Sequence, residues 1–419
     1  MSGKLIVRGG KSLRGEIHIS AAKNAVLPLI ACCIASEKEI RIKNCPRIAD
    51  IISMTEIIKE IGGYAEFDGD TLAVCCKDVS PRLVSAELTG GIRSSVFILG
   101  PILARFKRAN ISYPGGCEIG LRPIDLHIYG LKCLGVKVTE DGGTIACDGS
   151  AMTGGTVDLD FPSVGATENL MMAGLLGSGV TVIRNAAREP EIVDLQNFIN
   201  FLGGKAYGAG TGTVTVEGVD RLGSGGDYTP IGDRIAAATY LSAVAQTGGS
   251  VRVVGVEPEL MHSVLRKLCR VGCSVEEFDK AVILSSDGKL RSLHKIETQP
   301  YPGFPTDMQP QITAMLTTAL GTSFIVENLF ESRYNYTAQL VKMGANIIVS
   351  GRVAVVKGVK ALHSAFVKAE DLRGGAALLS AALATHGETV IDGVHHIDRG
   401  YYKIEDVYAS LGAEVYRTQ

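Results

Sequence analysis

The 419-residue chain contains no tryptophan, and aromatic residues make up only 6% of it. Ligand binding therefore cannot be followed by tryptophan fluorescence. Charge of one sign is not in excess either, because 42 basic residues stand against 44 acidic ones and the net charge is −2. A nearly neutral chain has no general attraction to nucleic acid or to anionic membranes. Any binding of an anion must then be local.

Long apolar runs are also missing. The longest early run, Ala25–Ala35, is too short to cross a bilayer. It imitates the core of a signal peptide, but we reject that interpretation because the run has counterparts at the same phase of a repeat. No lipidation signal is found at either end. The sequence thus predicts a cytoplasmic protein that has no membrane partner.

Cysteines at metal-binding or redox spacing are absent. The ten cysteines are scattered, with neither a Cys-x-x-Cys pair nor histidines at ligand spacing. This usage suits a reducing compartment. Most of them lie in apolar runs, Cys32 and Cys33 above all, and are expected to be small buried hydrophobic residues. Adjacent histidines such as His395 and His396 do not easily chelate one ion, so we predict no metal.

One sequence pattern recurs six times along the chain. A glycine ends an amphipathic helical stretch and precedes a short β-hairpin, at intervals of 68 to 73 residues. Glycine at this position suits a left-handed helix C-cap. The six glycines are Gly62, Gly135, Gly203, Gly272, Gly344 and Gly412.

Each repeat has the same predicted elements. It opens with a helix that is apolar on all sides and is therefore expected to be buried. A second helix has one apolar stripe, as at Leu195, Phe198 and Leu202, and two strands follow, as at Tyr64–Val74. These units predict an α/β protein of two domains, an inside-out α/β barrel in which sheets surround buried helices. The alternative is an ordinary solenoid with one stacked core.

The chain ends indicate two domains of three repeats each. The sixth repeat stops at Gln419 without its return strands, and Leu5–Gly10 followed by Gly15–Ser20 resembles the missing pair. We therefore expect residues 1–21 to complete the sixth repeat, which argues against a solenoid. A glycine-rich crossing at Arg221–Pro230 separates the halves. The predicted domains are residues 22–230 and residues 1–21 with 231–419, with the active site in the cleft between them.

Cys117 differs from the other cysteines. It lies in a loop with Pro114 and three glycines, and Arg122 is close in sequence. Such a loop is expected to be exposed, and a nearby guanidinium group favours a thiolate. The residues alone leave open both a reactive thiol and an incidental turn cysteine.

Polar and charged side chains recur just before the six buried helices. A charge at the start of an apolar helix is costly unless it has a partner or a ligand, and helix N-termini attract anions. With Arg122 and Arg399, the basic members predict a site for phosphate and carboxylate groups. A helix cap or a salt bridge is the alternative for any single residue. The residues at this phase are Lys23 with Asn24, Arg93, Ser163 with Thr167 and Glu168, Asp233 with Arg234, Asp307, and Asp371 with Arg373.

Asp307 stands at a helix start that two prolines stiffen, Pro302 and Pro305. Its carboxylate has two possible roles there. It caps the helix, or it accepts the proton of a substrate hydroxyl as a general base.

At Pro114–His127, Gly303–Gln309 and His396–Tyr401 the chain resembles the enolpyruvyl transferase family, and the likeness covers essentially its whole length. The cysteine loop, followed by the run at 122–126, is similar to the members that act on UDP-sugars. This resemblance implies transfer of the enolpyruvyl group of phosphoenolpyruvate to the 3-hydroxyl of UDP-N-acetylglucosamine, with release of phosphate, in peptidoglycan synthesis. It implies no cofactor, no nucleic acid and no obligate protein partner.

The resemblance also implies a role for each site residue. Cys117 would protonate the methylene carbon, and Asp307 would take the proton of the sugar hydroxyl. Lys23, Arg122 and Arg399 would hold phosphate and carboxylate. The Cys117 loop would act as a lid. The implied substrate-binding residues are Lys23, Asn24, Arg93, Arg122, Pro123, Ile124, Asp125, Leu126, Phe161, Pro162, Ser163, Val164, Asp307, Leu329, Arg333 and Arg373.

Two positions depart from the family pattern. Phe97 stands where many members carry tryptophan, and Phe330–Arg333 replaces a more usual Asn-Arg pair. Two other functions stay open. One is the same fold acting on a different acceptor, and the other is a non-catalytic scaffold or a relative that processes RNA ends. The near-zero net charge disfavours the last.

Overall fold

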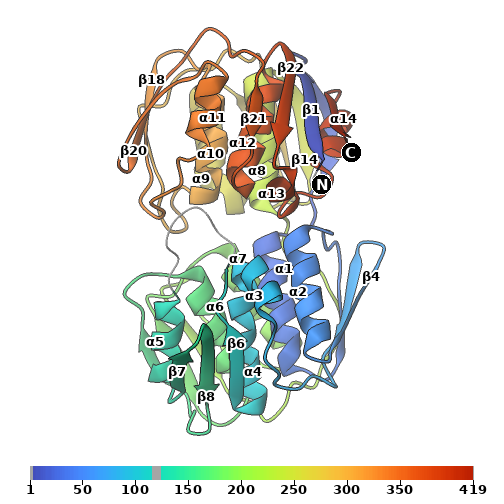
Figure 1. The fold of residues 1–419 in the computed structure, drawn as a ribbon, viewed down its shortest axis with the longest axis vertical. Helices are drawn as coiled ribbons and strands as arrows, with labels where there is room; N and C mark the ends of the chain where they lie inside the picture. The colour runs from blue at the N-terminus through green and yellow to red at the C-terminus, as the bar shows by residue number, and fades with distance from the viewer. Residues whose placement is uncertain (1–2, 116–123, 419) are drawn as a thin grey trace. The chain divides into compact units, whose positions relative to one another are not determined.

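The computed structural model describes residues 3–115 and 124–418 (Figure 1). The chain forms two compact units. Within the described residues, the middle unit comprises 21–115 and 124–231, and the terminal unit comprises 3–20 and 232–418. The domain boundaries expected from the sequence lie one residue from these.

Each unit contains three sheets in the part of the chain that the structure describes. The sheets of the middle unit have the strand orders β13-β3-β5-β4, β6-β8-β7 and β11-β12-β10-β9, and those of the terminal unit are β15-β16-β14-β2, β17-β18-β20-β19 and β21-β22-β1-β23. The strands of the middle unit are β3 (Glu39–Ile42), β4 (Tyr64–Asp68), β5 (Thr71–Cys75), β6 (Arg108–Ser112), β7 (Lys137–Asp141), β8 (Thr144–Asp148), β9 (Gly155–Asp158), β10 (Val180–Arg184), β11 (Lys205–Tyr207), β12 (Thr213–Glu217) and β13 (Gly226–Tyr228). Those of the terminal unit are β1 (Lys4–Gly9), β2 (Leu13–His18), β14 (Gly249–Val254), β15 (Ser274–Phe278), β16 (Ala281–Ser286), β17 (Lys295–Glu297), β18 (Thr322–Val326), β19 (Asn346–Ser350), β20 (Val353–Lys357), β21 (Phe366–Lys368), β22 (Gly387–Asp392) and β23 (Glu414–Thr418).

The two chain ends meet in one sheet. β1 pairs antiparallel with β22 and with β23, so the amino terminus supplies a missing strand of the sixth repeat as expected. The second expected strand goes elsewhere, because β2 pairs in parallel with β14 of the fourth repeat. The expected crossing at Arg221–Pro230 contains a strand, β13, which pairs in parallel with β3.

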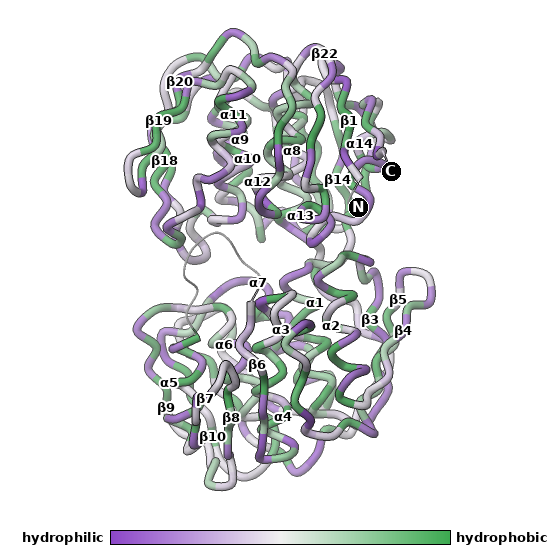
Figure 2. Tube along the Cα trace, viewed as in Figure 1, coloured by the Kyte–Doolittle hydropathy of each residue, from purple (hydrophilic) through white to green (hydrophobic). Residues whose placement is uncertain are grey.

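In the described part of each unit, three helices lie on the inside, and their residues are almost all buried. In the middle unit α1 (Lys23–Cys32), the pair η2 (Arg93–Ile98) and α4 (Leu99–Phe106), and α6 (Val164–Ala173) pack together. In the terminal unit α8 (Arg234–Thr247), α10 (Gln309–Leu316) and α12 (Leu372–Leu383) contact one another. Figure 2 shows hydrophobic residues along these helices. The predicted inside-out arrangement of helices and sheets is confirmed.

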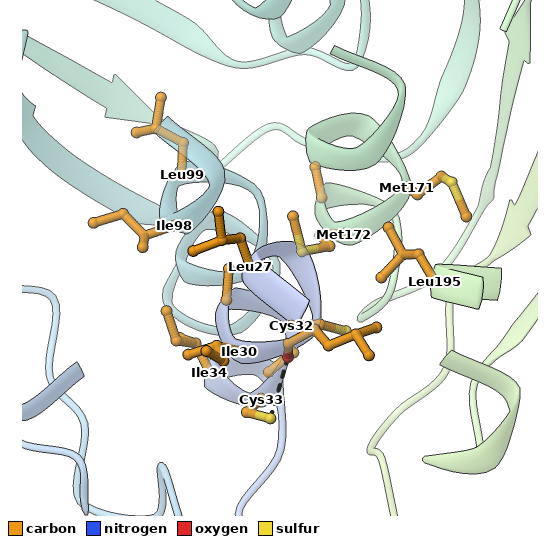
Figure 3. Packing of buried hydrophobic residues seen from close by; sticks show 14 of the residues in the cluster. Leu27, Ile30, Cys32, Cys33, Ile34, Ile98, Leu99, Met171, Met172 and Leu195 are labelled. Carbon is orange, nitrogen blue, oxygen red and sulfur yellow. Dashed lines mark hydrogen bonds between the residues drawn. The ribbon is translucent and has the colours of Figure 1, made fainter. Parts of the chain in front are cut away.

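Side chains from several helices interdigitate in the core of the middle unit (Figure 3). Leu27 and Ile30 of α1 lie beside Ile98 and Leu99, with Met172 of α6 close by. All five are at most 4% exposed. Where the apolar sequence continues past the end of a helix, a short 3-10 turn extends it, as at η1 (Cys33–Ala35).

The second helix of each repeat lies at the surface and ends before the repeated glycine. All six of these glycines have a positive φ, between 89° and 116°, as a left-handed C-terminal position requires. These helices are α2 (Ala49–Glu60), α5 (Asp125–Cys133), α7 (Pro190–Phe201), α9 (His262–Val271), α11 (Thr337–Lys342) and α14 (Ile404–Ser410), and the shorter elements are α3 (Ala86–Gly91), η3 (Pro258–Met261), η4 (Thr306–Met308) and α13 (Val394–Asp398).

Candidate active site

Asp307 is the centre of a charged group in the terminal unit. It lies in η4, which leads directly into α10. Its Oδ1 accepts a hydrogen bond from Arg333 Nη2 at 2.8 Å, and its Oδ2 accepts one from Arg373 Nη2 at 3.1 Å. The two arginine side chains are 2% and 4% exposed, whereas that of Asp307 is 29% exposed. Two buried cations thus fix a carboxylate that stays partly exposed.

Arg373 is held from its other side by Tyr401. Arg373 Nη1 donates to Tyr401 Oη at 3.1 Å, and the guanidinium carbon lies 5.6 Å from the centre of the Tyr401 ring. Burial opposes the charge of Arg373, but Tyr401 and Asp307 outweigh it and raise the pKa of the guanidinium group. The Tyr401 hydroxyl also lies 2.8 Å from Thr239 Oγ1 of α8 and 3.4 Å from Gln311 Nε2 of α10. Polar side chains therefore join all three buried helices of this unit.

A buried carboxylate that the sequence analysis did not single out shapes the neighbouring turn. Glu327 Oε1 accepts hydrogen bonds from Thr298 Oγ1 and from the Leu329 N–H, both at 2.9 Å. Its Oε2 accepts one from Thr306 Oγ1 at 3.0 Å. Because Glu327 is fully buried, these bonds replace its lost hydration. Glu327 thereby positions Leu329 and the residue that precedes Asp307.

Arg399 lies just after α13 in a loop that the last strand holds in place. Asp398 Oδ1 and Oδ2 each accept a hydrogen bond from Arg417 of β23 at 2.8 Å. Arg417 Nε also donates to Glu405 Oε1 of α14 at 2.7 Å. A fork of this kind restricts orientation as well as distance. The backbone that carries Arg399 is therefore restrained from the C-terminal side.

Lys23 is the first residue of α1 in the middle unit. Its Nζ lies 3.1 Å from Asp50 Oδ2 in the first turn of α2, and the two side chains are 12% and 5% exposed. The sequence alone did not predict this pair. Removal of either partner would take away an ion pair between two mostly buried charges. Asn24 follows Lys23 and is half-buried.

The other expected residues of this unit lie near the starts of η2, α5 and α6. Ser163 caps α6 and accepts a hydrogen bond from the Ala166 N–H at 3.3 Å. Arg93 begins η2, and its Nη1 donates to Pro114 O at 3.4 Å. Capping is thus the observed role of Ser163, as it is of Asp233 and Asp371 in the terminal unit. The remaining expected positions are exposed at Asp125 and Phe161, half-buried at Leu126, Pro162 and Val164, and buried at Ile124.

Known proteins resemble this chain over nearly its whole length. The family model described as EPSP synthase (3-phosphoshikimate 1-carboxyvinyltransferase) matches residues 7–408. The chain belongs to the enolpyruvyl transferase family. UDP-N-acetylglucosamine 1-carboxyvinyltransferase 2 of Caldanaerobacter subterraneus is 47% identical over 99% of each chain, and enzyme 1 of the same organism is 45% identical over 100% of each. The enzyme 1 of Symbiobacterium thermophilum is 47% identical over 99% of this chain and 95% of its own.

Solved structures agree with this placement. The enolpyruvyl transferase NikO from Streptomyces tendae matches with a TM-score of 0.89 and 25% identity, over 100% of this chain and 99% of its own. An EPSP synthase from Acinetobacter baumannii matches with a TM-score of 0.76 and 16% identity, over 100% of both chains. The second likeness shows the fold alone. The predicted family and fold class are both confirmed.

Three expected site residues of this enolpyruvyl transferase, Cys117, Arg122 and Pro123, lie outside the described residues. Most of the nine described cysteines are buried as expected, but Cys133 and Cys269 are exposed. Burial raises the pKa of Cys147 and of Cys273 to about 11, so both are neutral thiols at pH 7. Over residues 3–115 and 124–418, no helix is long and apolar enough to span a membrane, and no cluster of three metal-ligating side chains is found.

Glu168 of this enolpyruvyl transferase is one of the residues expected near the starts of the buried helices. It lies in α6 and is 1% exposed, and its Oε1 has no hydrogen-bond partner among the described residues. Burial, followed by the negative charges of Glu191 and Glu189, raises the pKa of Glu168 well above its usual range. Burial thus opposes the charged form of this side chain.

Glu168 therefore makes stability depend on pH. A carboxyl group with a raised pKa in the folded state stabilises the fold below its pKa in the unfolded chain, and this contribution is lost as the pH rises through the folded-state pKa. We expect the Tm of the native chain to fall, relative to that of Glu168→Gln, as the pH rises from the usual pKa of a glutamate, about 4.3. Thermal melts at increasing pH measure it, with exposed Glu56→Gln as the control. A Tm difference independent of pH would contradict the prediction.

Proposed function

We propose that this enolpyruvyl transferase moves the enolpyruvyl group of phosphoenolpyruvate to the 3-hydroxyl of UDP-N-acetylglucosamine and releases phosphate. The observation that carries the proposal is the full-length likeness, at 47% identity, to enzymes named for this acceptor. The reachable carboxylate between two buried arginines supplies a group that suits proton abstraction from a hydroxyl.

The proposed reaction has two stages. In the addition, Asp307 takes the proton of the sugar hydroxyl as its oxygen bonds to C2 of phosphoenolpyruvate, and Cys117 gives a proton to C3. In the elimination, C3 loses a proton, the double bond returns and the C2–O bond to phosphate breaks. Electrons and atoms balance without a redox partner, so the proposal includes no cofactor. The protonating role of Cys117 comes from the family resemblance.

In the proposed reaction, basic side chains stabilise the negative charge that develops on the substrate. Lys23, Arg122 and Arg399 bind the phosphate and carboxylate of phosphoenolpyruvate. The Lys23 ammonium group is already restrained by Asp50, and the Arg399 loop by Arg417, so little reorganisation is needed when charge develops.

The sugar nucleotide is assigned to the residues that precede helices. Arg93 and Arg122 to Leu126 bind the diphosphate side, Phe161 to Val164 lie along the uracil, and Leu329 contacts the sugar nucleotide. The remaining assigned residues are Asn24 beside the tetrahedral carbon and Arg333 and Arg373 around Asp307. Helix N-termini favour anionic groups, which supports the diphosphate assignment.

In the cell, this activity is the first committed step of peptidoglycan synthesis. The enzyme then acts in the cytoplasm, contributes to cell shape and division, and is a target of fosfomycin through Cys117. The ten scattered cysteines suit the reducing conditions of the cytoplasm.

The deciding experiment measures phosphate release from phosphoenolpyruvate by the purified chain. We expect release only when UDP-N-acetylglucosamine is present, and none with shikimate 3-phosphate, the acceptor in the name of the family model. Release with shikimate 3-phosphate but not with UDP-N-acetylglucosamine would agree with the family and show that the proposed acceptor is wrong. The absence of release with either acceptor, together with retained binding of phosphoenolpyruvate, would favour a third acceptor.

A further inference from the structure

We propose that Tyr401 is a positioning residue for the reaction, because its hydroxyl orients Arg373 and, through it, the Asp307 carboxylate. The proposal rests on the proposed function, since it takes Asp307 as the proton acceptor. All the groups involved belong to the terminal unit.

The hydrogen bonds around Tyr401 have only one consistent direction. Arg373 Nη1 at 3.1 Å and Gln311 Nε2 at 3.4 Å both donate to the Tyr401 oxygen. The atoms of Gln311 and Arg373 that face the tyrosine are both donors, and Thr239 uses its own proton for a backbone carbonyl, so the tyrosine O–H donates to Thr239 Oγ1 at 2.8 Å. Thr239 in turn donates to Ile235 O at 2.8 Å. The chain of bonds ends at a backbone carbonyl of α8 and leaves the hydroxyl no freedom to turn.

Packing fixes the tyrosine itself. Tyr401 is 2% exposed, and its ring lies edge-on to Tyr240 with centroids 6.4 Å apart. A phenylalanine would keep this contact and the stacking of Arg373 over the ring. What it would lose is the acceptor of one buried guanidinium nitrogen, and an unsatisfied buried charged donor is costly.

The carboxylate of Asp307 is held from two independent directions. Arg333 holds Oδ1, and its own place is set by hydrogen bonds from its Nε and Nη2 to Thr306 O at 3.3 and 3.1 Å. Arg373 holds Oδ2, and Tyr401 sets its place. Loss of the tyrosine hydroxyl therefore loosens the restraint on Arg373 and on Oδ2, while the hydrogen bond from Arg333 to Oδ1 is unchanged. Small displacements of a reacting group lower the rate without removing bound substrate.

The test is Tyr401→Phe in the full chain, assayed as phosphate release with phosphoenolpyruvate and UDP-N-acetylglucosamine. We expect kcat to fall by about tenfold, the equivalent of one lost hydrogen bond to a charged group. KM for both substrates should stay within about twofold, because the change affects the transition state rather than binding. Thr239→Val, which removes the acceptor of the tyrosine proton, should lower kcat in the same direction and by less.

The matched control is Tyr408→Phe. Tyr408 is fully buried and packs on the same Tyr240 ring, with centroids 5.3 Å apart. Among the described residues, its hydroxyl forms no hydrogen bond with Arg373, Thr239 or Gln311. This variant should keep the native kcat. An equal loss of kcat in both variants, or a rise in KM at unchanged kcat, would overturn the positioning role.

Two further comparisons distinguish a failure of the positioning role of Tyr401 from a failure of the proposed function. If the native chain releases no phosphate, the proposed function fails. If Asp307→Asn is as active as the native chain, the transfer reaction stands but Asp307 is not the base, and Tyr401 then has no reacting group to position. If Asp307→Asn is inactive and Tyr401→Phe keeps native kcat, the function stands and the positioning role alone is wrong. In the combined Tyr401→Phe and Asp307→Asn variant, we expect no loss beyond that of Asp307→Asn.

Discussion

Asp307→Asn is expected to abolish nearly all release of phosphate from phosphoenolpyruvate in the presence of UDP-N-acetylglucosamine. An amide keeps the size of the side chain but cannot accept the proton of a sugar hydroxyl. Loss of a general base typically lowers the rate by about a hundredfold to ten thousandfold. The measurement is kcat from the initial rate of phosphate release at saturating substrates.

The surroundings of Asp307 add a second effect in the same direction. Both of its oxygens accept hydrogen bonds from buried arginines, at 2.8 and 3.1 Å. In the asparagine variant, one of these guanidinium groups faces an amide NH2 and loses its acceptor. Binding of the sugar nucleotide should weaken little by comparison, so kcat falls more than KM rises.

Exposed Asp287→Asn, on a surface turn of the same unit, is the control and should retain native kcat. A mild loss for Asp307→Asn, within about tenfold, would mean that another group accepts the proton, because a base at the reacting hydroxyl contributes more than that. The carboxylate would then be an electrostatic partner of the two arginines only.

Much of the fold follows from local pattern. Six buried helices, six surface helices and their glycine ends could be placed from apolar periodicity and backbone chemistry, because these signals are local. The pairing partner of a strand is not local. β2 and β13 each join a sheet from a distant part of the chain, in parallel register with β14 and β3. Their short sequences contain nothing that specifies which edge they complete.

The residues of the candidate site could also be predicted only in part. Asp307 and Arg373 stand out in the sequence because each breaks an apolar pattern at a helix start. Their pairing with each other, 66 residues apart, needs the packing of α10 against α12. Glu327 and Tyr401 carry no comparable signal, since a single polar residue beside a strand or after a short helix is common. Burial is what makes them important, and burial is known only from the fold.

Close packing of the buried helices gives the second large expected effect. Gly100 of α4 lies against α6, and a Cβ there would stand 2.3 Å from Asn169 O and 2.7 Å from Asn169 Oδ1. Both are polar atoms of a fully buried residue, and Oδ1 already accepts the Gly100 N–H at 2.7 Å. Gly100→Ala must therefore push two helices apart and break that hydrogen bond. We expect a loss of about 3 kcal/mol in the free energy of unfolding, as for other overpacked cores.

Urea unfolding followed by circular dichroism measures this loss as a lower midpoint at unchanged slope. Gly90→Ala is the matched control, because Gly90 is also helical but its Cβ would meet no atom within 4 Å. That variant should be neutral or slightly more stable, since alanine favours a helix by about 1 kcal/mol over glycine. Equal stability of Gly100→Ala and the native chain would show that α4 and α6 can separate at little cost. The buried helices would then be a loosely packed layer, and the precise placement of the polar residues at their starts would need another source of rigidity.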